Sequence, residues 1–267
     1  MPDMKNYKAI FEGVESTLLS IGSQNLPLDK IRENLEWFKN VEGKVYSDAD
    51  YYWTLVCVIF YAGFKAATVN AKLSLIRKWF PDYKTVANYD KGKVKEILND
   101  PEMIRNQRKI QACINNAYIF KGIVNDYRSF KEYIDSFAPT ESFENLMLLK
   151  EELEYRFSGL GKITTYHFLT DIGLPVLKPD RVICRIFQRL GLIESDKQLI
   201  KTVIQGRKFA QATGHPIRYI DIVFVSYGQM ESIEFGIDRG ICLETNPYCA
   251  LCGISKYCTY YAQKMAP

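Results

Sequence analysis

The chain has 267 residues, 47% of them hydrophobic and 25% charged, with a formal net charge of +4 and a sequence pI near 8.5. This length allows one large domain or two small ones with a real hydrophobic core, and the composition is that of a soluble globular protein. No run of about 18 apolar residues occurs, which argues against a transmembrane helix and a membrane partner. The first fifteen residues lack the apolar core of a signal peptide, so we expect a cytoplasmic location.

Apolar residues recur at helical spacing along most of the chain. From Tyr51 to Phe80 the spacing predicts two helices separated near residues 62–65, with Pro81 ending the second. Further helices are predicted over 91–100, 106–127 and 141–157, and from Lys162 and Asp180 onward. Alternating strand patterns are few and no Asn-Gly hairpin turn occurs, so we predict an all-α fold.

A short glycine turn in the middle of the chain is the first candidate for function. Gly159-Leu160-Gly161 lies between two predicted helices. The glycines permit a tight turn that leaves backbone N–H groups exposed, beside the positive end of the next helix. This arrangement suits a phosphate group. An ordinary turn between helices is the alternative interpretation.

Asp180 directly precedes a predicted helix and follows Pro179. It is therefore expected to be the N-cap, with its carboxylate accepting from the backbone N–H of Val182 or Ile183. The helix dipole favours the ionised carboxylate. Asp180 is then either a structural cap alone or an acid that stabilises a cationic sugar or orients a water.

Four of the seven cysteines form a cluster near the C-terminal end. Cys242, Cys249, Cys252 and Cys258 have the spacing C-x6-C-x2-C-x5-C. In a reducing compartment such a cluster more often binds metal than forms disulfides. The residues alone leave zinc and an iron–sulfur cluster open, although zinc sites usually have two C-x2-C pairs and this loop has one.

Together, these motifs resemble the helix-hairpin-helix superfamily of base-excision DNA glycosylases. The segment from Phe157 to Leu192 is similar to the hairpin and the catalytic aspartate that follows it, and the cysteine spacing is similar to the [4Fe–4S] loop of the endonuclease III branch. Residues 103–117 also look like part of 3-methyladenine DNA glycosylase I. The match covers roughly residues 48–258.

The resemblance implies two helical domains with a DNA cleft between them. Residues 48–174 would form a six-helix barrel with the hairpin, and 1–47 with 175–267 an iron–sulfur cluster domain. It further implies that Asp180 is catalytic and that the four cysteines hold a [4Fe–4S] cluster. The partner would be double-stranded DNA, bound by a monomer in the cytoplasm, associated with the nucleoid.

The same comparison suggests DNA contacts and a base pocket. Gly159, Gly161 and Lys162 of the hairpin would contact phosphates, as would Arg105, Arg108 and Lys109. Lys256 is a further phosphate candidate in the cysteine loop. Candidates for the base pocket or for a wedge in the base stack are Phe64, Ile104, Tyr61 and Tyr166, and His167 is a weaker candidate acid.

Departures from the family patterns set the expected chemistry. Ile163 occupies the position of the Schiff-base lysine of endonuclease III, and Lys162 lies one residue earlier. We therefore predict a monofunctional glycosylase rather than a bifunctional glycosylase/lyase. Ala62 stands where the methyladenine enzymes have a pocket glutamate, so their substrate is not carried over. A non-catalytic iron–sulfur module that binds DNA is the competing hypothesis from another class.

Overall fold

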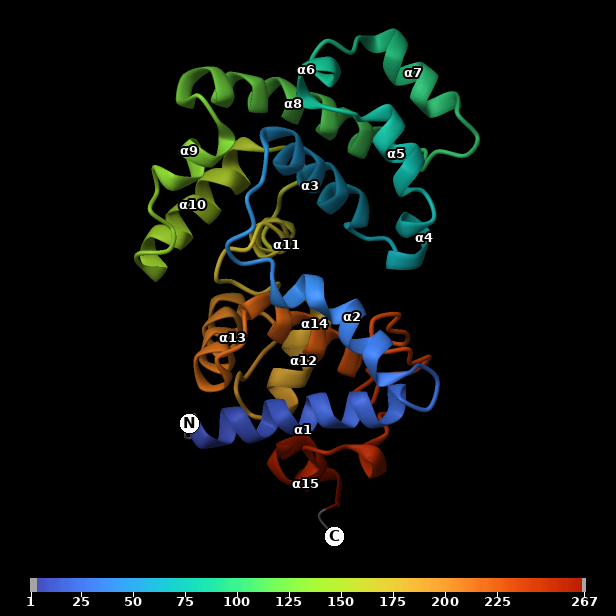
Figure 1. Cartoon of the computed structure of the whole chain (residues 1–267), viewed down its shortest axis with the longest axis vertical. Coiled ribbons are helices and arrows are strands. Elements are labelled where there is room, and N and C mark those ends of the chain that lie inside the picture. Colours follow the sequence, from blue (N-terminus) through green and yellow to red (C-terminus); the bar gives the residue numbers. More distant parts are fainter. Residues whose placement is uncertain (1–3, 266–267) are drawn as a thin grey trace. The chain divides into compact units, whose positions relative to one another are not determined.

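The computed structural model describes residues 4–265, which form helices joined by turns and loops (Figure 1). In this range the only β-type pairing is an isolated bridge between Ser232 and Ile237. The all-α prediction is confirmed. The chain divides into two compact units, residues Lys44–Leu174 and residues up to Gly43 together with those from Pro175.

The 44–174 unit is built around two long helices. These are α3 (Asp48–Tyr61) and α8 (Gln107–Tyr127), which pack on each other. The shorter helices of the unit are α4 (Ala66–Asn70), α5 (Leu73–Trp79), α6 (Tyr83–Val86), α7 (Lys91–Asn99), α9 (Phe130–Asp135), α10 (Phe143–Arg156) and α11 (Thr164–Asp171).

Local sequence explains how α3 begins and what it buries. Ser47 is its N-cap and forms a capping box with Asp50: the Asp50 N–H donates to Ser47 Oγ at 3.2 Å, and the Ser47 N–H donates to Asp50 Oδ2 at 3.0 Å. The helix then buries Tyr52, whose hydroxyl donates to the Cys113 carbonyl of α8 at 3.1 Å. Burying this hydroxyl is tolerated because it is hydrogen-bonded.

Helix boundaries differ from the sequence prediction in two places. The helix expected to reach Phe80 is divided into α4 and α5, where Asn70 ends α4 and the Tyr61 hydroxyl donates to its side chain. Asn favours such breaks because its side chain competes with helical hydrogen bonds. The helix after the glycine turn begins at Thr164 rather than Lys162.

The other unit combines the two ends of the chain. Its helices are α1 (Met4–Gly22), α2 (Leu28–Lys39), α12 (Arg181–Arg189), α13 (Leu199–Thr213), α14 (Ile217–Gly228) and α15 (Thr259–Met265), with 3₁₀ turns at Cys249–Leu251 and Ser255–Tyr257. Helix α1 packs on both α13 and α14. Phe187, Phe209 and Phe224 meet in the core, with ring centroids 4.7–5.4 Å apart.

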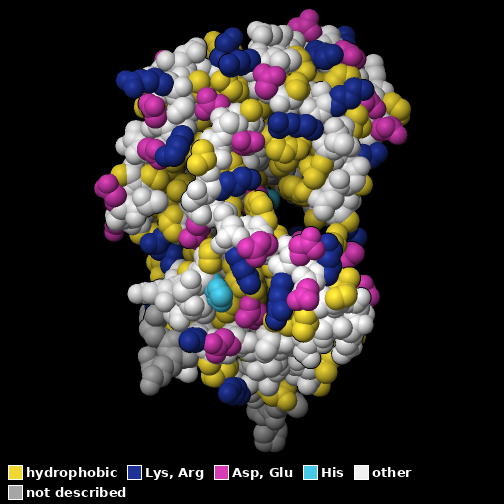
Figure 2. Space-filling model, viewed as in Figure 1, with side chains coloured by type: hydrophobic (Ala, Val, Ile, Leu, Met, Phe, Trp, Pro, Cys, Tyr) yellow, Lys and Arg dark blue, Asp and Glu magenta, His cyan; other side chains and the backbone are white. Residues whose placement is uncertain are grey.

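None of the helices within residues 4–265 combines the length and apolarity that a membrane crossing needs. On the face shown in Figure 2, basic side chains are interspersed with acidic ones rather than gathered into one basic surface. This face therefore offers no continuous basic surface to a nucleic acid.

Candidate active site and cysteine loop

A buried asparagine side chain fixes the glycine turn. Gly159 has φ +82°, and a Cβ there would lie 3.3 Å from Ile59 of α3. Asn116 of α8 is fully buried and makes two hydrogen bonds with the backbone of Ser158: it donates to the carbonyl at 2.8 Å and accepts from the N–H at 2.8 Å. The turn is thereby fixed to α8, a connection that the sequence analysis missed.

The amides of the turn are less open than the sequence suggested. The Gly161 N–H donates to Thr164 Oγ1 at 2.6 Å, and this hydroxyl also lies 3.1 Å from the Gly159 carbonyl oxygen. The expectation that the glycines leave their N–H groups free is therefore wrong for Gly161. The Thr164 side chain must rotate before a phosphate can accept from that N–H.

Three unpaired cations lie on the turn or at the start of α8. Lys162, Arg105 and Arg108 are exposed, and within the described residues none of them makes an ion pair or a hydrogen bond. Arg108 lines an open groove of about 660 Å³ together with Asn115, Ser158 and Gly159. The start of α8, where Asn106 accepts from the Lys109 N–H at 3.2 Å, lies along the same groove. These groups can neutralise a nucleic-acid backbone.

Lys109 does not belong with these cations. Its ammonium donates to the Ile59 carbonyl and, at 2.7 Å, to the Ala62 carbonyl, so it satisfies the C-terminal end of α3. Burial lowers the pKa of Lys109. The prediction that Lys109 contacts phosphate is corrected to a structural role, because both carbonyls would lose their donor.

The aromatic candidates fall into two groups. Phe64 is 39% exposed on the turn that follows Gly63, whose φ is +77°, and Lys109 Nζ lies 5.4 Å from its ring centre. Tyr166 is only 2% exposed, and its hydroxyl is 3.5 Å from Met147 Sδ, so it offers no face to a base. The interpretation of Tyr166 as a pocket residue is corrected to a core residue of α11.

Ile104, Tyr61 and His167 are all partly buried. The ring of Tyr61 lies 6.1 Å from that of His167, whose Nε2 is 3.2 Å from Asp171 Oδ2 on the next turn of α11. His167 is thus a paired residue of the helix surface.

Asp180 has two carboxylate oxygens in different surroundings. Oδ1 accepts from the Val182 N–H at 2.9 Å and the Ile183 N–H at 3.1 Å, which confirms the predicted N-cap of α12. Oδ2 makes no such cap bond and lies 3.8 Å from Lys178 Nζ, with the Asp180 side chain 20% exposed. One oxygen is fixed by the helix and the other can face a substrate.

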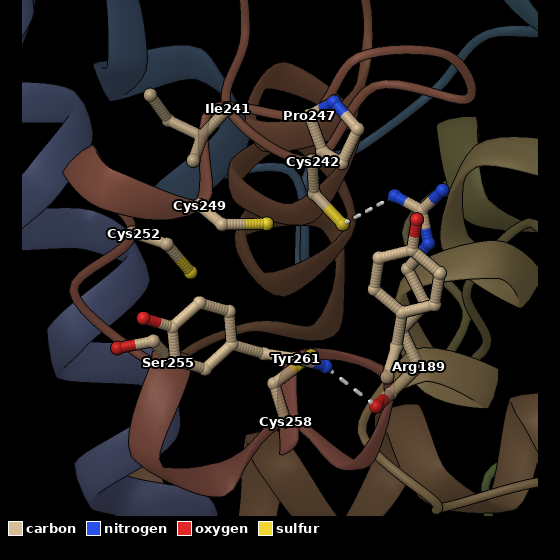
Figure 3. Close-up of a pocket in the computed structure, with 10 residues that line it drawn as sticks. Arg189, Ile241, Cys242, Pro247, Cys249, Cys252, Ser255, Cys258 and Tyr261 are labelled. Atoms are coloured by element: carbon tan, nitrogen blue, oxygen red, sulfur yellow. Dashed lines mark hydrogen bonds between the residues drawn. The ribbon is translucent and has the colours of Figure 1, made fainter. Parts of the chain in front are cut away.

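The four cysteines line one small cavity (Figure 3). Donors approach three of their sulfurs: Arg189 Nη1 lies 3.3 Å from Cys242 Sγ, the Tyr227 hydroxyl 3.2 Å from Cys252 Sγ, and the Tyr261 N–H 3.4 Å from Cys258 Sγ. Cys249 is the fourth cysteine that lines the cavity. In the part of the chain that the structure describes, no three His, Cys, Asp or Glu side chains are arranged to hold a single metal ion.

Two arginines of α12 support this loop rather than facing solvent. Arg185 donates to the Cys242 carbonyl at 3.2 Å and to the Gly228 carbonyl at 2.6 Å. Arg189 donates to the Leu243 carbonyl at 2.7 Å and covers the ring of Tyr260 at 4.5 Å. Their spacing of four residues places both side chains on one face of α12, and this spacing was the signal that the sequence offered.

A family model described as methyladenine glycosylase matches residues 33–177, slightly more than half of the chain. The chain belongs to the methyladenine glycosylase family. It is accordingly a DNA N-glycosylase, as the sequence resemblance implied. The match ends three residues before Asp180 and does not include the cysteine loop.

Two solved structures with TM-scores above 0.5 show the same helical fold at low sequence identity. A trapped covalent intermediate of endonuclease III with DNA has a TM-score of 0.55 and 14% identity, covering 88% of this chain and 95% of that chain. The 8-oxoguanine DNA glycosylase of Thermotoga maritima has a TM-score of 0.51 and 19% identity, covering 80% and 95%. The 3-methyladenine DNA glycosylase I of Staphylococcus aureus has 21% identity over 52% of this chain and 84% of that chain, with a TM-score of 0.45.

Proposed function

We propose that this glycosylase is monofunctional: it extrudes a damaged or modified base from duplex DNA, hydrolyses the N-glycosidic bond and leaves an abasic site. The observation that carries the proposal is the Asp180 carboxylate, whose Oδ1 is fixed by two backbone N–H groups while the side chain as a whole is 20% exposed. The two N–H donors fix the orientation of this carboxylate at the start of α12. An anion held in place can stabilise the positive charge that develops on the sugar as the base departs.

The unit of residues 44–174 would supply the grip on DNA. Lys162, Arg105 and Arg108 are exposed cations that make no ion pair or hydrogen bond within the described residues, and Arg108 shares a groove with the glycine turn. Extruding a base costs a few kcal/mol, and a side chain that fills the gap offsets part of this cost. Phe64, on an exposed glycine turn, is the better wedge candidate, and Ile104 is the alternative.

Water is the proposed nucleophile because the hairpin lacks a suitably placed amine. Ile163 occupies the position of the family lysine, and its backbone is already in the αR conformation at the start of α11. Lys162 is exposed at the turn. Water attack at C1′ would give an abasic site in an intact strand, which breaks only on treatment with alkali.

The cysteine loop is proposed to hold a [4Fe–4S] cluster. The four cysteines share one cavity, and Arg189 directs a donor at Cys242 Sγ. Donors of this kind stabilise cluster-bound thiolates. A bound cluster would tie the segment from Cys242 to Cys258 together and supply a redox centre. Lys256, exposed on this segment, is the proposed phosphate contact.

One observation favours a second candidate, a glycosylase that also cleaves the strand. Lys178 Nζ lies 3.8 Å from Asp180 Oδ2, so an amine is present beside the proposed catalytic carboxylate. In that case Asp180 would accept a proton from the Lys178 ammonium, the free amine would attack C1′ as the base leaves, and borohydride would reduce and trap the resulting imine. This amine comes from the Asp180 turn and not from the hairpin.

The test is release of free bases from duplexes that carry single modified bases, and from heavily modified genomic DNA. Chromatography identifies the released base, and gels with and without alkali report strand breaks. A released base with alkali-dependent breaks supports the monofunctional enzyme. A borohydride adduct that Lys178→Met removes supports the second candidate. DNA binding with no base released from any substrate would support a non-catalytic module.

A further inference from the structure

We propose that Asp221, a buried carboxylate of α14, is a positioning residue for Asp180; this inference rests on the proposed role of Asp180 in base release. Asp221 is 4% exposed, in a helix whose other inward side chains are mostly apolar. A charge in such a place is tolerated only when it is paired and hydrogen-bonded. The hydrogen-bond partners of the Asp221 carboxylate therefore indicate its role.

Both oxygens of Asp221 are engaged, and they bind different parts of the unit. Oδ2 accepts from Arg218 Nη1 at 2.6 Å within α14. Oδ1 accepts from the backbone N–H of Lys178 at 3.0 Å, across 43 residues of sequence. The first contact compensates the buried charge, and the second connects it to the turn that bears Asp180.

The link from Lys178 to Asp180 is one step long. The Asp180 N–H donates to the Lys178 carbonyl at 2.8 Å, which closes a tight turn immediately before α12. If Lys178 is displaced, the backbone of Asp180 moves with it. Asp221 thus sets the position at which Asp180 enters α12.

Neighbouring contacts fix the rest of the same segment. Arg207 Nη1 donates to the Pro175 carbonyl at 2.8 Å. Leu177 is fully buried against Gly206 of α13, where any Cβ would overlap its side chain. The segment from Pro175 to Asp180 is thus held by α13 at its beginning and by Asp221 of α14 at its end.

Asp221→Asn is the sharpest substitution because it keeps the shape and removes one of two acceptors. The Lys178 N–H and Arg218 both require an acceptor, and an amide offers one oxygen, so its NH₂ group must face one of the two donors. Displacements of about 1 Å in an active site can lower rates by about 100-fold. We therefore expect single-turnover base release at saturating DNA to fall at least tenfold, with DNA affinity within about twofold of wild type.

Tyr219→Phe is the matched control. Tyr219 lies on α14, as Asp221 does, but its hydroxyl donates to Glu15 of α1 and makes no hydrogen bond with the 175–180 segment. It should lower the melting temperature and leave the rate unchanged. Arg218→Met combined with Asp221→Asn frees the amide oxygen to accept from Lys178, and it should recover part of the lost rate. This recovery also keeps the proposal testable if Asp221→Asn folds poorly.

Asp180→Asn is measured beside these variants. If it retains activity, the proposed function fails whatever Asp221 does. If it is inactive while folded Asp221→Asn releases base at the wild-type rate, the positioning role of Asp221 is overturned and the proposed function stands. A loss of rate in Tyr219→Phe as large as in Asp221→Asn would also overturn it, because general destabilisation would then account for both.

Discussion

Asn116→Ala should loosen the glycine turn without disturbing the rest of the 44–174 unit. The substitution removes two hydrogen bonds of 2.8 Å, one to each backbone group of Ser158. A typical hydrogen bond contributes about 1 kcal/mol net, so the pair contributes about 2 kcal/mol. Ser158 is exposed, and water can therefore satisfy its freed groups and keep the loss near this value. For a chain of this size that corresponds to a decrease of roughly 4–8 °C in melting temperature.

The effect should also be visible at the turn itself and in DNA binding. The rate of amide hydrogen exchange should increase more at Gly159 and Gly161 than at the amides of α8 and α11. DNA affinity should fall by about tenfold, because ordering the released turn on binding costs roughly 1–2 kcal/mol per residue. Asn115→Ala, an exposed amide on the same helix, is the stability control and should change the unfolding free energy by less than about 0.5 kcal/mol. Unchanged stability and unchanged exchange in Asn116→Ala would refute this reasoning.

Three further predictions concern other parts of the molecule. Ser47→Ala should lower stability by about 1 kcal/mol through loss of the α3 capping box. In the wild type, hydrogen bonds from Ser47 lower the pKa of Asp50. This stabilisation is therefore present above the ordinary carboxyl pKa of about 3.9 and is lost as the pH falls through the pKa of Asp50 in the folded protein. NMR titration should show a higher pKa for Asp50 in the variant. Arg189→Met should increase several-fold the rate at which the proposed [4Fe–4S] cluster loses iron to a chelator, followed by visible absorbance, and an unchanged rate would argue against donation from Arg189 to Cys242. Phe64→Ala should slow base release from duplex DNA more than from a mismatched site that is already unstacked, and equal effects would contradict the wedge.

Sequence patterns within a few residues correctly predicted the features that depend on local contacts, such as helix caps and helical spacing. Asp180 caps α12 because its carboxylate accepts from the otherwise unpaired N–H groups of the first helical turn, and the structure shows the expected bonds from Val182 and Ile183. The all-α fold likewise follows from apolar spacing within single helices. The family could be inferred because its hairpin and aspartate lie within one short segment.

What the sequence did not show depends on contacts between distant segments. Asn116 binds Ser158 across 42 residues, and nothing in its own helix distinguishes it from Asn115. The family resemblance suggested a phosphate contact for Lys109, whereas in the structure its ammonium donates to carbonyls at the end of α3 that lack other donors. Asp221 looks in sequence like one more polar residue of α14, and only its burial reveals its use.

The most direct test of the account is single-turnover base release by wild type and Asp180→Asn on the same duplex, with DNA affinity measured for both. Asparagine can still accept from the Val182 and Ile183 N–H groups, so α12 should keep its cap and the protein its fold. The account predicts that Asp180→Asn binds DNA as tightly as wild type and releases no base. Base release at the wild-type rate by Asp180→Asn would contradict it.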